Sequence, residues 1–481
     1  MCARDPLTTI LGIPGPSTIV ATSSMLFTSL HWIVFLLCVF LVFHLAPPTW
    51  RRWLMLAASV YFYGSWSAPY LLLILGQLLV DWTCGYLLGR TLDSGRRKWI
   101  LATSVILNLS ALAVFKYFGF IARTLGFTTT VNLTLPLAIS FYTFESMSYT
   151  IDVYRRRLQP VRSPAHLALF ITWFPHLIAG PIIRPSELFP QLGNISPATR
   201  ERFFGGLALM VVGYSKKLLG ADWLATVAEP VFRDPSLYTS LELLIAIYAY
   251  AFQIYLDFSA YTDIARGASR WFGVELPENF NDPYLATSIT DFWRRWHITL
   301  SHWLRDYLYI PLGGNRRGPL RAYLNLFVTM LLGGLWHGAN WTFVVWGGLH
   351  GIYLVTERLF GLRARDYVGL ALWARRLITF HMVCFAWIFF RAPTFEAAWQ
   401  IIRGLGAGTL HFVGDRLFPM LGAIALIVGY WLGFPLRRRI LAWNPGSSLL
   451  RQTVCAAAMG LFVVILMVLG ASSDTFIYFQ F

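Results

Sequence analysis

Two neighbouring stretches decide the fold of this chain: DFWRRWHITLSHWLRDYLYIPLGGNRRG at residues 291–318 and GGLWHGANWTFVVWGGLHG at residues 333–351. The second is largely apolar, and Gly334 and Gly338 flank its first histidine, His337. An ionisable side chain at the centre of a bilayer costs about 3 kcal/mol, so it usually faces a bundle interior or a wet cavity. From this stretch alone, His337 is either a functional residue or a hydrogen-bonded histidine between glycines that let helices pack closely. The same glycine spacing recurs around a second histidine, at Gly347, His350 and Gly351.

Residues 291–310 have the pattern of one amphipathic helix. One side is apolar and rich in tryptophan, formed by Phe292, Trp293, Trp296, Leu300, Trp303, Leu304 and Tyr307. The other side is polar and basic, formed by Asp291, Arg294, Arg295, Ser301, His302, Arg305 and Asp306. This composition is typical of a helix that lies at a membrane interface. We expect His297 at the edge of the polar side, a helix end at the 311–315 turn, and entry of a polar substrate beside this helix.

The composition indicates an all-α polytopic membrane protein. Of 481 residues, 57% are hydrophobic and only 13% are charged, whereas soluble domains carry about 25% charged residues. The net charge of +16 does not indicate nucleic-acid binding, because the basic residues cluster in short runs between apolar spans, as in cytoplasmic loops. The sequence has no P-loop, G-x-S-x-G or H-E-x-x-H pattern, which argues against those nucleotide-binding and hydrolase classes. We expect no metal and no bound cofactor.

Apolar segments recur along the whole chain. A segment that crosses a bilayer as a helix needs about 20 residues. The candidate spans lie at residues 26–46, 53–63, 70–88, 99–118, 135–151, 203–219, 237–258, 371–390, 417–434 and 454–469. Basic runs at 51–52, 96–98 and 155–157 fall on one side if successive spans form hairpins, and the positive-inside rule makes that side cytoplasmic. Residues 1–24 show no apolar period, so we expect a disordered extension there and one membrane-embedded domain over residues 25–481.

Other ionisable residues in apolar context have mainly structural interpretations. Residues 173–188, WFPHLIAGPIIRPSEL, are short and proline-rich, so we expect a re-entrant segment and not a full span. We favour its histidine, His176, as a hydrogen-bonded core residue over a cavity-lining one. For Asp257 and Asp263 we favour structural ion pairs over a catalytic role, because Arg266 follows Asp263 by one helical turn.

Several segments resemble the membrane-bound O-acyltransferase family, and in particular its bacterial alginate O-acetyltransferase branch. They are NFNDPYLATSITDFWRRWHITLSHWLRDYLYIPLGGNRRG at residues 279–318, the 333–351 stretch, and shorter segments at residues 135–156, 173–188 and 475–481. The resemblance implies a helical bundle around a central funnel or tunnel, with short interfacial and re-entrant helices. It also implies that His337 is the catalytic histidine and His297 a second functional one.

The resemblance further implies an enzyme that transfers an acetyl group from cytoplasmic acetyl-CoA across the bacterial inner membrane. The group would serve O-acetylation of an extracytoplasmic polysaccharide such as alginate, cellulose or peptidoglycan. The expected partners are acetyl-CoA, membrane lipid, and a periplasmic acetyltransferase with its polysaccharide. Two alternatives stay open: D-alanyl transfer to teichoic acid from a carrier protein, and a channel or transporter with a histidine-lined path. The sequence shows no broken helices in two matching halves, which argues against an inverted-repeat transporter.

The chemistry gives His337 a specific role. A thioester is already activated, so the main task is to deprotonate the attacking hydroxyl, and a neutral imidazole with an ordinary pKa of about 6.5 can do this near neutral pH. We therefore assign His337 as the general base, with an acyl-histidine intermediate as the less favoured variant. Trp336 and Trp341 would shape a dry pocket. Asn340 would hydrogen-bond to the ring or to the thioester oxygen.

Coenzyme A is highly anionic, so its phosphates need a basic surface, and guanidinium groups match phosphate oxygens well. The candidate residues are Arg294, Arg295, Arg305, Arg316, Arg317 and Arg321. The alternative is that these arginines only anchor the 291–310 helix to anionic lipid. We expect His337 to lie deep in a tunnel open to both membrane faces, with the 291–310 helix near its cytoplasmic mouth.

Overall fold

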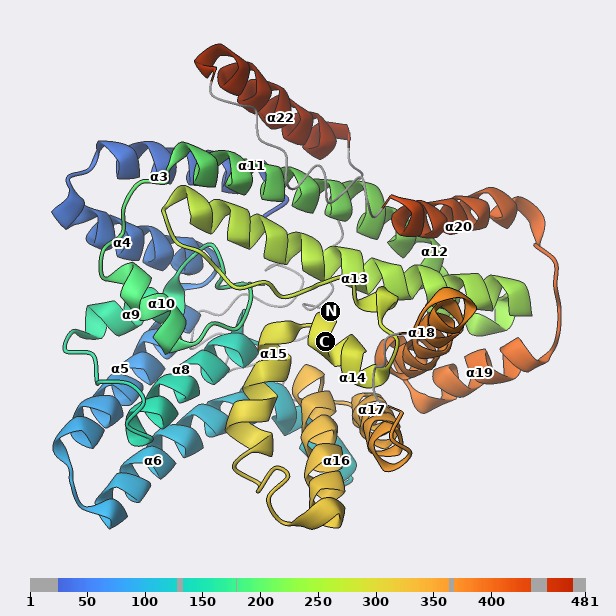
Figure 1. Cartoon of the computed structure of the whole chain (residues 1–481), viewed down its shortest axis with the longest axis horizontal. Helices are drawn as coiled ribbons and strands as arrows, with labels where there is room; N and C mark the ends of the chain where they lie inside the picture. Colours follow the sequence, from blue (N-terminus) through green and yellow to red (C-terminus); the bar gives the residue numbers. More distant parts are fainter. Residues whose placement is uncertain (1–24, 128–132, 179, 363–366, 434–447, 470–481) are drawn as a thin grey trace, which may run out of the picture. The chain divides into compact units, whose positions relative to one another are not determined.

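The computed structural model describes residues 25–127, 133–178, 180–362, 367–433 and 448–469 (Figure 1). Regular structure within these ranges is entirely helical, which confirms the expected all-α class. Six of the described helical segments are long and apolar enough to cross a membrane: Ala68–Arg90, Ser94–Thr124, Ser240–Trp271, Gly369–Arg391, Gly414–Leu432 and Leu450–Met467. The expected extension at 1–24 and the C-terminal segment at 475–481 lie outside the described residues.

The chain forms two compact units, one made of Met1–Met210 with Ile264–Pro277 and the other of Val211–Asp263 with Glu278–Phe481. The helices of the first unit are α3 (Leu30–Leu45), α4 (Pro48–Trp66), α5 (Ala68–Arg90), α6 (Ser94–Leu112), the π-helical turn η1 (Ala113–Tyr117), α7 (Phe118–Thr124), α8 (Ile139–Tyr154), α9 (Pro164–Thr172) and α10 (Pro185–Leu192). Two more helices, α11 (Arg200–Ser215) and α13 (Ser240–Trp271), contain residues of both units.

The second unit carries the two stretches that decide the fold. Its helices are η2 (Lys216–Ala221), α12 (Asp222–Arg233), η3 (Pro235–Leu237), η4 (Pro283–Leu285), α14 (Ile289–Arg295), α15 (Ile298–Trp303), η5 (Leu304–Tyr309), α16 (Gly318–His337), α17 (Trp341–Leu359), α18 (Gly369–Arg391), α19 (Phe395–Gly406), η6 (Gly414–Arg416), α20 (Leu417–Leu432) and α22 (Leu449–Leu469). In Figure 1, α16 and α17 lie side by side as a hairpin below α14 and α15.

The first unit has the hairpin topology expected from its basic runs. The buried side chain of Arg97, at the start of α6, donates hydrogen bonds to carbonyl oxygens at the C-terminal ends of α5 and α8. The acceptors are Leu88, Thr91 at 3.1 Å, Val153 at 3.3 Å and Tyr154 at 2.7 Å. A cation is favourable beside the C-terminal end of a helix, where the carbonyl groups have no partner in the helix. The 96–98 and 155–157 runs therefore lie at the same end of the unit, as the hairpin prediction requires.

The 173–188 segment does not form a full span. Its described residues 173–178 and 180–184 are irregular backbone after α9, and its last four residues begin the eight-residue α10. Apolar side chains of these residues, including Trp173 and Phe174, are buried. His176 is buried too, and its Nε2 donates to the Glu145 carboxylate at 3.1 Å, which also accepts the Ile183 backbone N–H at 2.9 Å. Both predictions are confirmed: the segment is short and irregular, and His176 is a hydrogen-bonded core residue.

The two aspartates of α13 form ion pairs with neighbouring lysines. Lys217 Nζ lies 2.9 Å from Asp257 Oδ1 and 2.6 Å from Asp222 Oδ1, and Lys216 Nζ lies 2.6 Å from Asp263 Oδ2. Buried charges need such partners, because an unpaired buried charge is very costly. The structural interpretation of both aspartates is confirmed with lysine partners. The expected Asp263–Arg266 pair joins residues of different units and stays a prediction.

Candidate functional site

The stretch over residues 291–310 is three short helical segments and not one helix, so that prediction is wrong. The chain leaves helical geometry at Trp296, and His297 adopts a left-handed conformation with φ of 41° before α15 begins. This conformation costs a residue other than glycine roughly 1–3 kcal/mol and is kept only where its surroundings fix it. A helical wheel assumes an unbroken helix, so it placed His297 on the wrong surface.

Asn279 fixes this break from outside the helices. Its Oδ1 accepts hydrogen bonds from the N–H and the hydroxyl of Thr299, at 3.2 and 2.9 Å, and lies 3.2 Å from Nδ1 of His297. Because an amide oxygen only accepts, Nδ1 of His297 carries the proton and Nε2 is the basic nitrogen. His297 is fully buried, and burial lowers its pKa to about 3, so the imidazole is neutral at physiological pH.

The tryptophan-rich side of this stretch is covered by protein. Its apolar side chains Phe292, Trp293, Trp296, Leu300, Trp303 and Leu304 are all buried. Among the described residues, Trp296 packs on Trp387 of α18 with ring centroids 5.0 Å apart, and Trp293 packs on Trp346 of α17 at 5.8 Å. The tryptophan-rich side therefore packs against protein, and the place of the segment at a membrane interface stays a prediction. Composition alone does not distinguish lipid from a protein core, because both are apolar.

His337 is the last residue of α16 and is only 4% exposed. Three aromatic rings contact its imidazole edge to face: Trp336 at 4.9 Å, Trp346 at 5.0 Å and Phe390 at 5.2 Å between centroids. Trp336 also lies 6.3 Å from the ring of His297. The structure therefore brings together the two histidines that the sequence singled out, with Trp336 between them.

The glycines around the histidines hold α16 against α17. A Cβ atom added to Gly334 would collide with the Phe343 carbonyl oxygen and lie 3.0 Å from Gly347 Cα, and one added to Gly338 would collide with the Phe343 ring. A Cβ on Gly351 would lie 2.8 Å from the Phe327 side chain. This confirms the close-packing role expected for the glycine pairs, and it fixes the position of His337 at the end of the hairpin.

Asn340 and Trp341 lie differently from the expectation. Asn340 caps the N-terminus of α17, where its Oδ1 accepts the Thr342 N–H at 3.2 Å and its Nδ2 donates to the Pro393 carbonyl at 3.0 Å. Asparagine is a preferred residue at this position of a helix. Trp341 is 49% exposed, so it does not shape a dry pocket. Trp346, one turn further along α17, packs on His337 instead.

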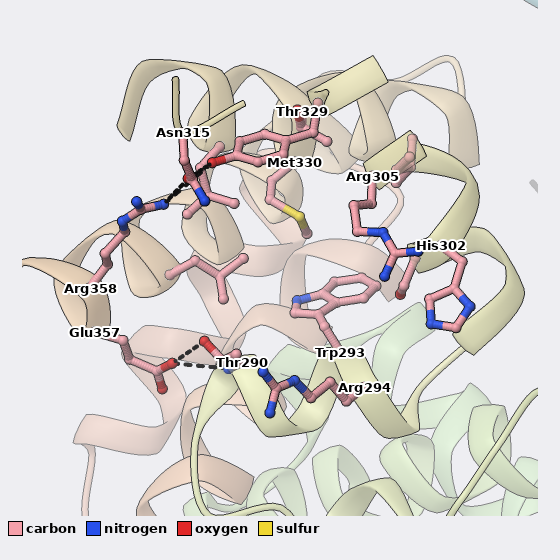
Figure 2. A pocket seen from close by; sticks show the side chains of 15 residues that line it. Thr290, Trp293, Arg294, His302, Arg305, Asn315, Thr329, Met330, Glu357 and Arg358 are labelled. Atoms are coloured by element: carbon pink, nitrogen blue, oxygen red, sulfur yellow. Dashed lines mark hydrogen bonds between the residues drawn. The ribbon is translucent and has the colours of Figure 1, made fainter. Parts of the chain in front are cut away.

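A cavity of about 600 Å³ opens beside α14, α15 and the end of α17 (Figure 2). This is the size range of small-molecule sites. Its polar lining consists of Thr290, Arg294, Ser301, His302, Arg305, Tyr309, Asn315, Thr329, Glu357 and Arg358. Its apolar lining consists of Trp293, Leu304, Leu326, Met330 and Leu354. Because Arg294, His302 and Arg305 are exposed, the polar end of the cavity is accessible from the protein surface.

The cavity separates the candidate arginines into two groups. Arg294 and Arg305 line it, whereas Arg316, Arg317 and Arg321 are exposed residues outside its lining. Arg295 also lies outside the lining and forms an ion pair with Asp291 at 2.9 Å. Arg305 is partly neutralised, since its Nε lies 2.7 Å from Asp306 Oδ1. Arg294 has no hydrogen-bond or ion-pair partner within the described ranges, so its guanidinium is available to an anion.

Sequence reasoning missed two charged residues at the end of α17. Glu357 accepts hydrogen bonds from the Thr290 N–H and hydroxyl, both at 2.9 Å, and so holds the start of α14. Arg358 donates to Asn315 Oδ1 at 2.7 Å and to the Tyr309 hydroxyl at 3.3 Å. Figure 2 shows both residues along one side of the cavity. The signal for them was present, because a Glu-Arg pair ends an otherwise apolar helix.

Comparisons with known proteins identify the family of this chain. The profile of MBOAT, the membrane-bound O-acyltransferase family, matches residues 61–393. The probable alginate O-acetylase AlgI of Pseudomonas aeruginosa is 40% identical over 395 residues, which cover 79% of this chain and 75% of the relative. The peptidoglycan O-acetyltransferase of Helicobacter pylori is 37% identical over 74% of this chain and 73% of its own length.

A more distant relative is the teichoic acid D-alanyltransferase of Bacillus subtilis, 27% identical over 65% of this chain and 82% of its own length. The chain belongs to the membrane-bound O-acyltransferase family. It is therefore a multi-pass membrane enzyme that transfers acyl groups to oxygen. Membership of an enzyme family removes the channel or transporter alternative.

Proposed function

We propose that this enzyme takes an acetyl group from acetyl-CoA at the cytoplasmic face of a bacterial inner membrane and passes it on for O-acetylation of an extracytoplasmic polysaccharide. The observation that carries the proposal is a cavity lined by three arginines, whose lining residue Trp293 packs on Trp346, a direct neighbour of His337. The similarity to an alginate O-acetylase and to a peptidoglycan O-acetyltransferase supports an acetyl group and a polysaccharide acceptor. A periplasmic acetyltransferase is the expected partner that receives the group.

The cavity suits the anionic part of coenzyme A. Arg294, Arg305 and Arg358 supply positive charge at its polar end, and guanidinium forks bind phosphate oxygens well. The cavity also has a buried apolar part, which a thioester arm requires. It is formed by Trp293, Leu304 and Met330. Trp293 connects the cavity to His337, because it packs on Trp346 and Trp346 packs on His337.

The reaction assigns a role to each histidine. His337 accepts the proton of the attacking hydroxyl, the oxygen forms a bond to the thioester carbonyl carbon, and the carbon–sulfur bond breaks. The thiolate of coenzyme A then takes the proton, so the products are an ester and free thiol. His297 is neutral, with its basic nitrogen at Nε2, and orients the acceptor or the transferred group. The aromatic surroundings keep both imidazoles away from bulk water.

D-alanyl transfer from a carrier protein is the other candidate within the enzyme class. The lower identity to the Bacillus subtilis D-alanyltransferase favours acetyl transfer. The test is release of free thiol by the detergent-purified chain from acetyl-CoA, and separately from a D-alanyl carrier protein. The proposal requires turnover of acetyl-CoA. Turnover of the carrier protein alone would assign the D-alanyl reaction, and labelled acetate found only on cytoplasmic acceptors would contradict transfer across the membrane.

Arg294→Ala is expected to raise the KM for acetyl-CoA about tenfold or more and to leave kcat nearly unchanged. The reason is the loss of a charge-assisted hydrogen bond to a phosphate, worth roughly 1.5–3 kcal/mol, at a point away from the reacting atoms. Arg316→Ala is the matched control, because Arg316 is exposed and outside the cavity lining. Equal KM values for the two variants would remove Arg294 from the donor site.

His297→Ala is expected to reduce turnover, but less than His337→Ala does. His297 orients a reactant and does not take the proton, and its pKa of about 3 means that it does not titrate between pH 5 and 9. The acid limb of the pH–rate profile should therefore be the same in this variant and in the unmodified protein. A shifted acid limb, or a loss equal to that of His337→Ala, would show that His297 is the base.

A further inference from the structure

The apolar side of the cavity lies against α16, which supplies Leu326 and Met330 to its lining. Three of its apolar lining residues, Trp293, Leu304 and Met330, are buried. Met330, Gly333 and His337 lie on the same face of α16, because their spacing is three and then four residues. His337 lies about 10 Å beyond Met330, at 1.5 Å per residue. A group that moves along this face from the cavity to His337 would pass Trp293, Leu304 and Gly333, which together are called the constriction below.

Glycine and tryptophan set the width of the constriction. A Cβ atom on Gly333 would lie 3.2 Å from Leu304 Cδ1, so the missing side chain leaves just enough room for leucine. In Figure 2 the Met330 thioether points toward the indole ring of Trp293. The indole is 9% exposed and contacts Trp346, which contacts His337. Trp293 is thus the cavity residue that links most directly to the catalytic histidine.

His350 holds this indole in place, although the proposed reaction gives it no role. The indole N–H of Trp293 donates to Nδ1 of His350 at 3.3 Å, and the two ring centroids lie 5.1 Å apart. His350 is fully buried, and the ring of Phe292 stacks on it at 6.0 Å with an interplanar angle of 12°. Accepting at Nδ1 requires the neutral tautomer with its proton on Nε2. A buried polar side chain in an aromatic cluster is costly, and the bond to Trp293 is the one hydrogen bond of the His350 side chain among the described residues, so it calls for an explanation.

We propose that Trp293 limits the size of the acyl group that reaches His337, and that His350 is the positioning residue that fixes Trp293. This inference rests on the proposed acyl-CoA reaction. It adds the residue that determines which acyl chain length the enzyme accepts. With the indole fixed, the constriction admits an acetyl group and excludes longer chains. Without the bond to His350, the indole can rotate about its side-chain torsions. Larger acyl groups can then reach His337.

The test compares acetyl-CoA, propionyl-CoA and butyryl-CoA as donors for the purified full chain, with free thiol as the readout. Trp293→Ala is expected to raise the ratio of kcat/KM for butyryl-CoA to that for acetyl-CoA at least tenfold, since one methylene in an apolar pocket changes discrimination by about 10–200-fold. His350→Ala should raise the ratio by a smaller factor. His350→Asn should restore it, because the asparagine side chain can accept the indole hydrogen bond at the same place.

Two further variants keep the test decisive if Trp293→Ala does not fold. Gly333→Ala narrows the constriction. It should lower the ratio of kcat/KM for propionyl-CoA to that for acetyl-CoA, which is the opposite of the change expected for Trp293→Ala. Trp303→Ala removes an equally buried tryptophan of α15 that is outside the cavity lining, and it should leave all ratios unchanged. Unchanged ratios in the Trp293, His350 and Gly333 variants, with acetyl-CoA still turned over, would overturn this inference alone. A protein that turns over no acyl-CoA would instead overturn the proposed function.

Discussion

His337→Ala is expected to lower acetyl-CoA turnover by about 10²–10⁴-fold, the usual contribution of a general base. The imidazole sits at the end of α16 among Trp336, Trp346 and Phe390, where water cannot replace it efficiently. Alanine removes the only proton acceptor that this position can offer. The KM for acetyl-CoA should change little, because the cavity that would hold the donor is formed by other residues.

His381→Ala is the matched control for this prediction. His381 lies on α18 in the same unit, is exposed, and bonds to the Tyr248 hydroxyl at 2.7 Å. Its loss should leave turnover within about twofold, since surface substitutions usually change stability by less than 0.5 kcal/mol. The measurement is thiol release by both variants, with thermal unfolding to show that each is folded. Near-normal turnover by a folded His337→Ala protein would contradict the assignment.

Gly347→Ala is expected to destabilise the protein by about 1–3 kcal/mol, the usual cost of overpacking a tight core, and to lower activity with it. The added methyl group would collide with the Met330 carbonyl oxygen and lie 3.1 Å from Gly334 Cα, so α16 and α17 would have to separate. Since His337 ends α16, that movement also displaces the imidazole. Thermal unfolding in detergent and thiol release measure the two effects.

The neighbouring residue provides the control on the same helix. A Cβ on Gly348 would meet only Leu331 Cδ1 at 3.7 Å, which is an ordinary contact. Gly348→Ala should therefore be neutral or slightly stabilising, because alanine favours a helix by about 1 kcal/mol over glycine. If the two variants unfolded at the same temperature, the close approach of α16 and α17 at Gly347 would not matter for stability.

The sequence predicted the helices well where they depend on local features, namely the length of an apolar segment and the residues that form turns. The hairpin of α4 and α5, the short backbone at 173–188 and the glycine contacts between α16 and α17 all follow from spacing and residue type. The break at His297 could not be predicted in this way. It depends on Asn279, which is eighteen residues away and bonds to His297 and Thr299. A periodic pattern does not contain such a contact.

The sequence predicted the types of residue that form the candidate site, but only some of the individual residues. The two histidines and Trp336 do lie together, and Arg294 and Arg305 do line a cavity. Arg316 and Arg317 are exposed and lie outside the lining, although Asn315 just before them belongs to it. Arg358 enters it from the end of α17, and such contacts between distant segments depend on tertiary packing. The tunnel through His337 stays a prediction, since His337 is not among the residues that line the cavity.

The most direct test is a structure of the full chain in a lipid nanodisc with a non-hydrolysable acetyl-CoA analogue. Our account predicts phosphate groups at Arg294 and Arg358, the pantetheine arm beside Trp293, and the acetyl carbonyl at a distance from His337 that a hydroxyl and its proton can bridge. Reacting atoms in such complexes lie about 3–3.5 Å apart. A coenzyme bound elsewhere, or an acetyl group separated from His337 by an intact wall of Trp293 and Trp346, would contradict it.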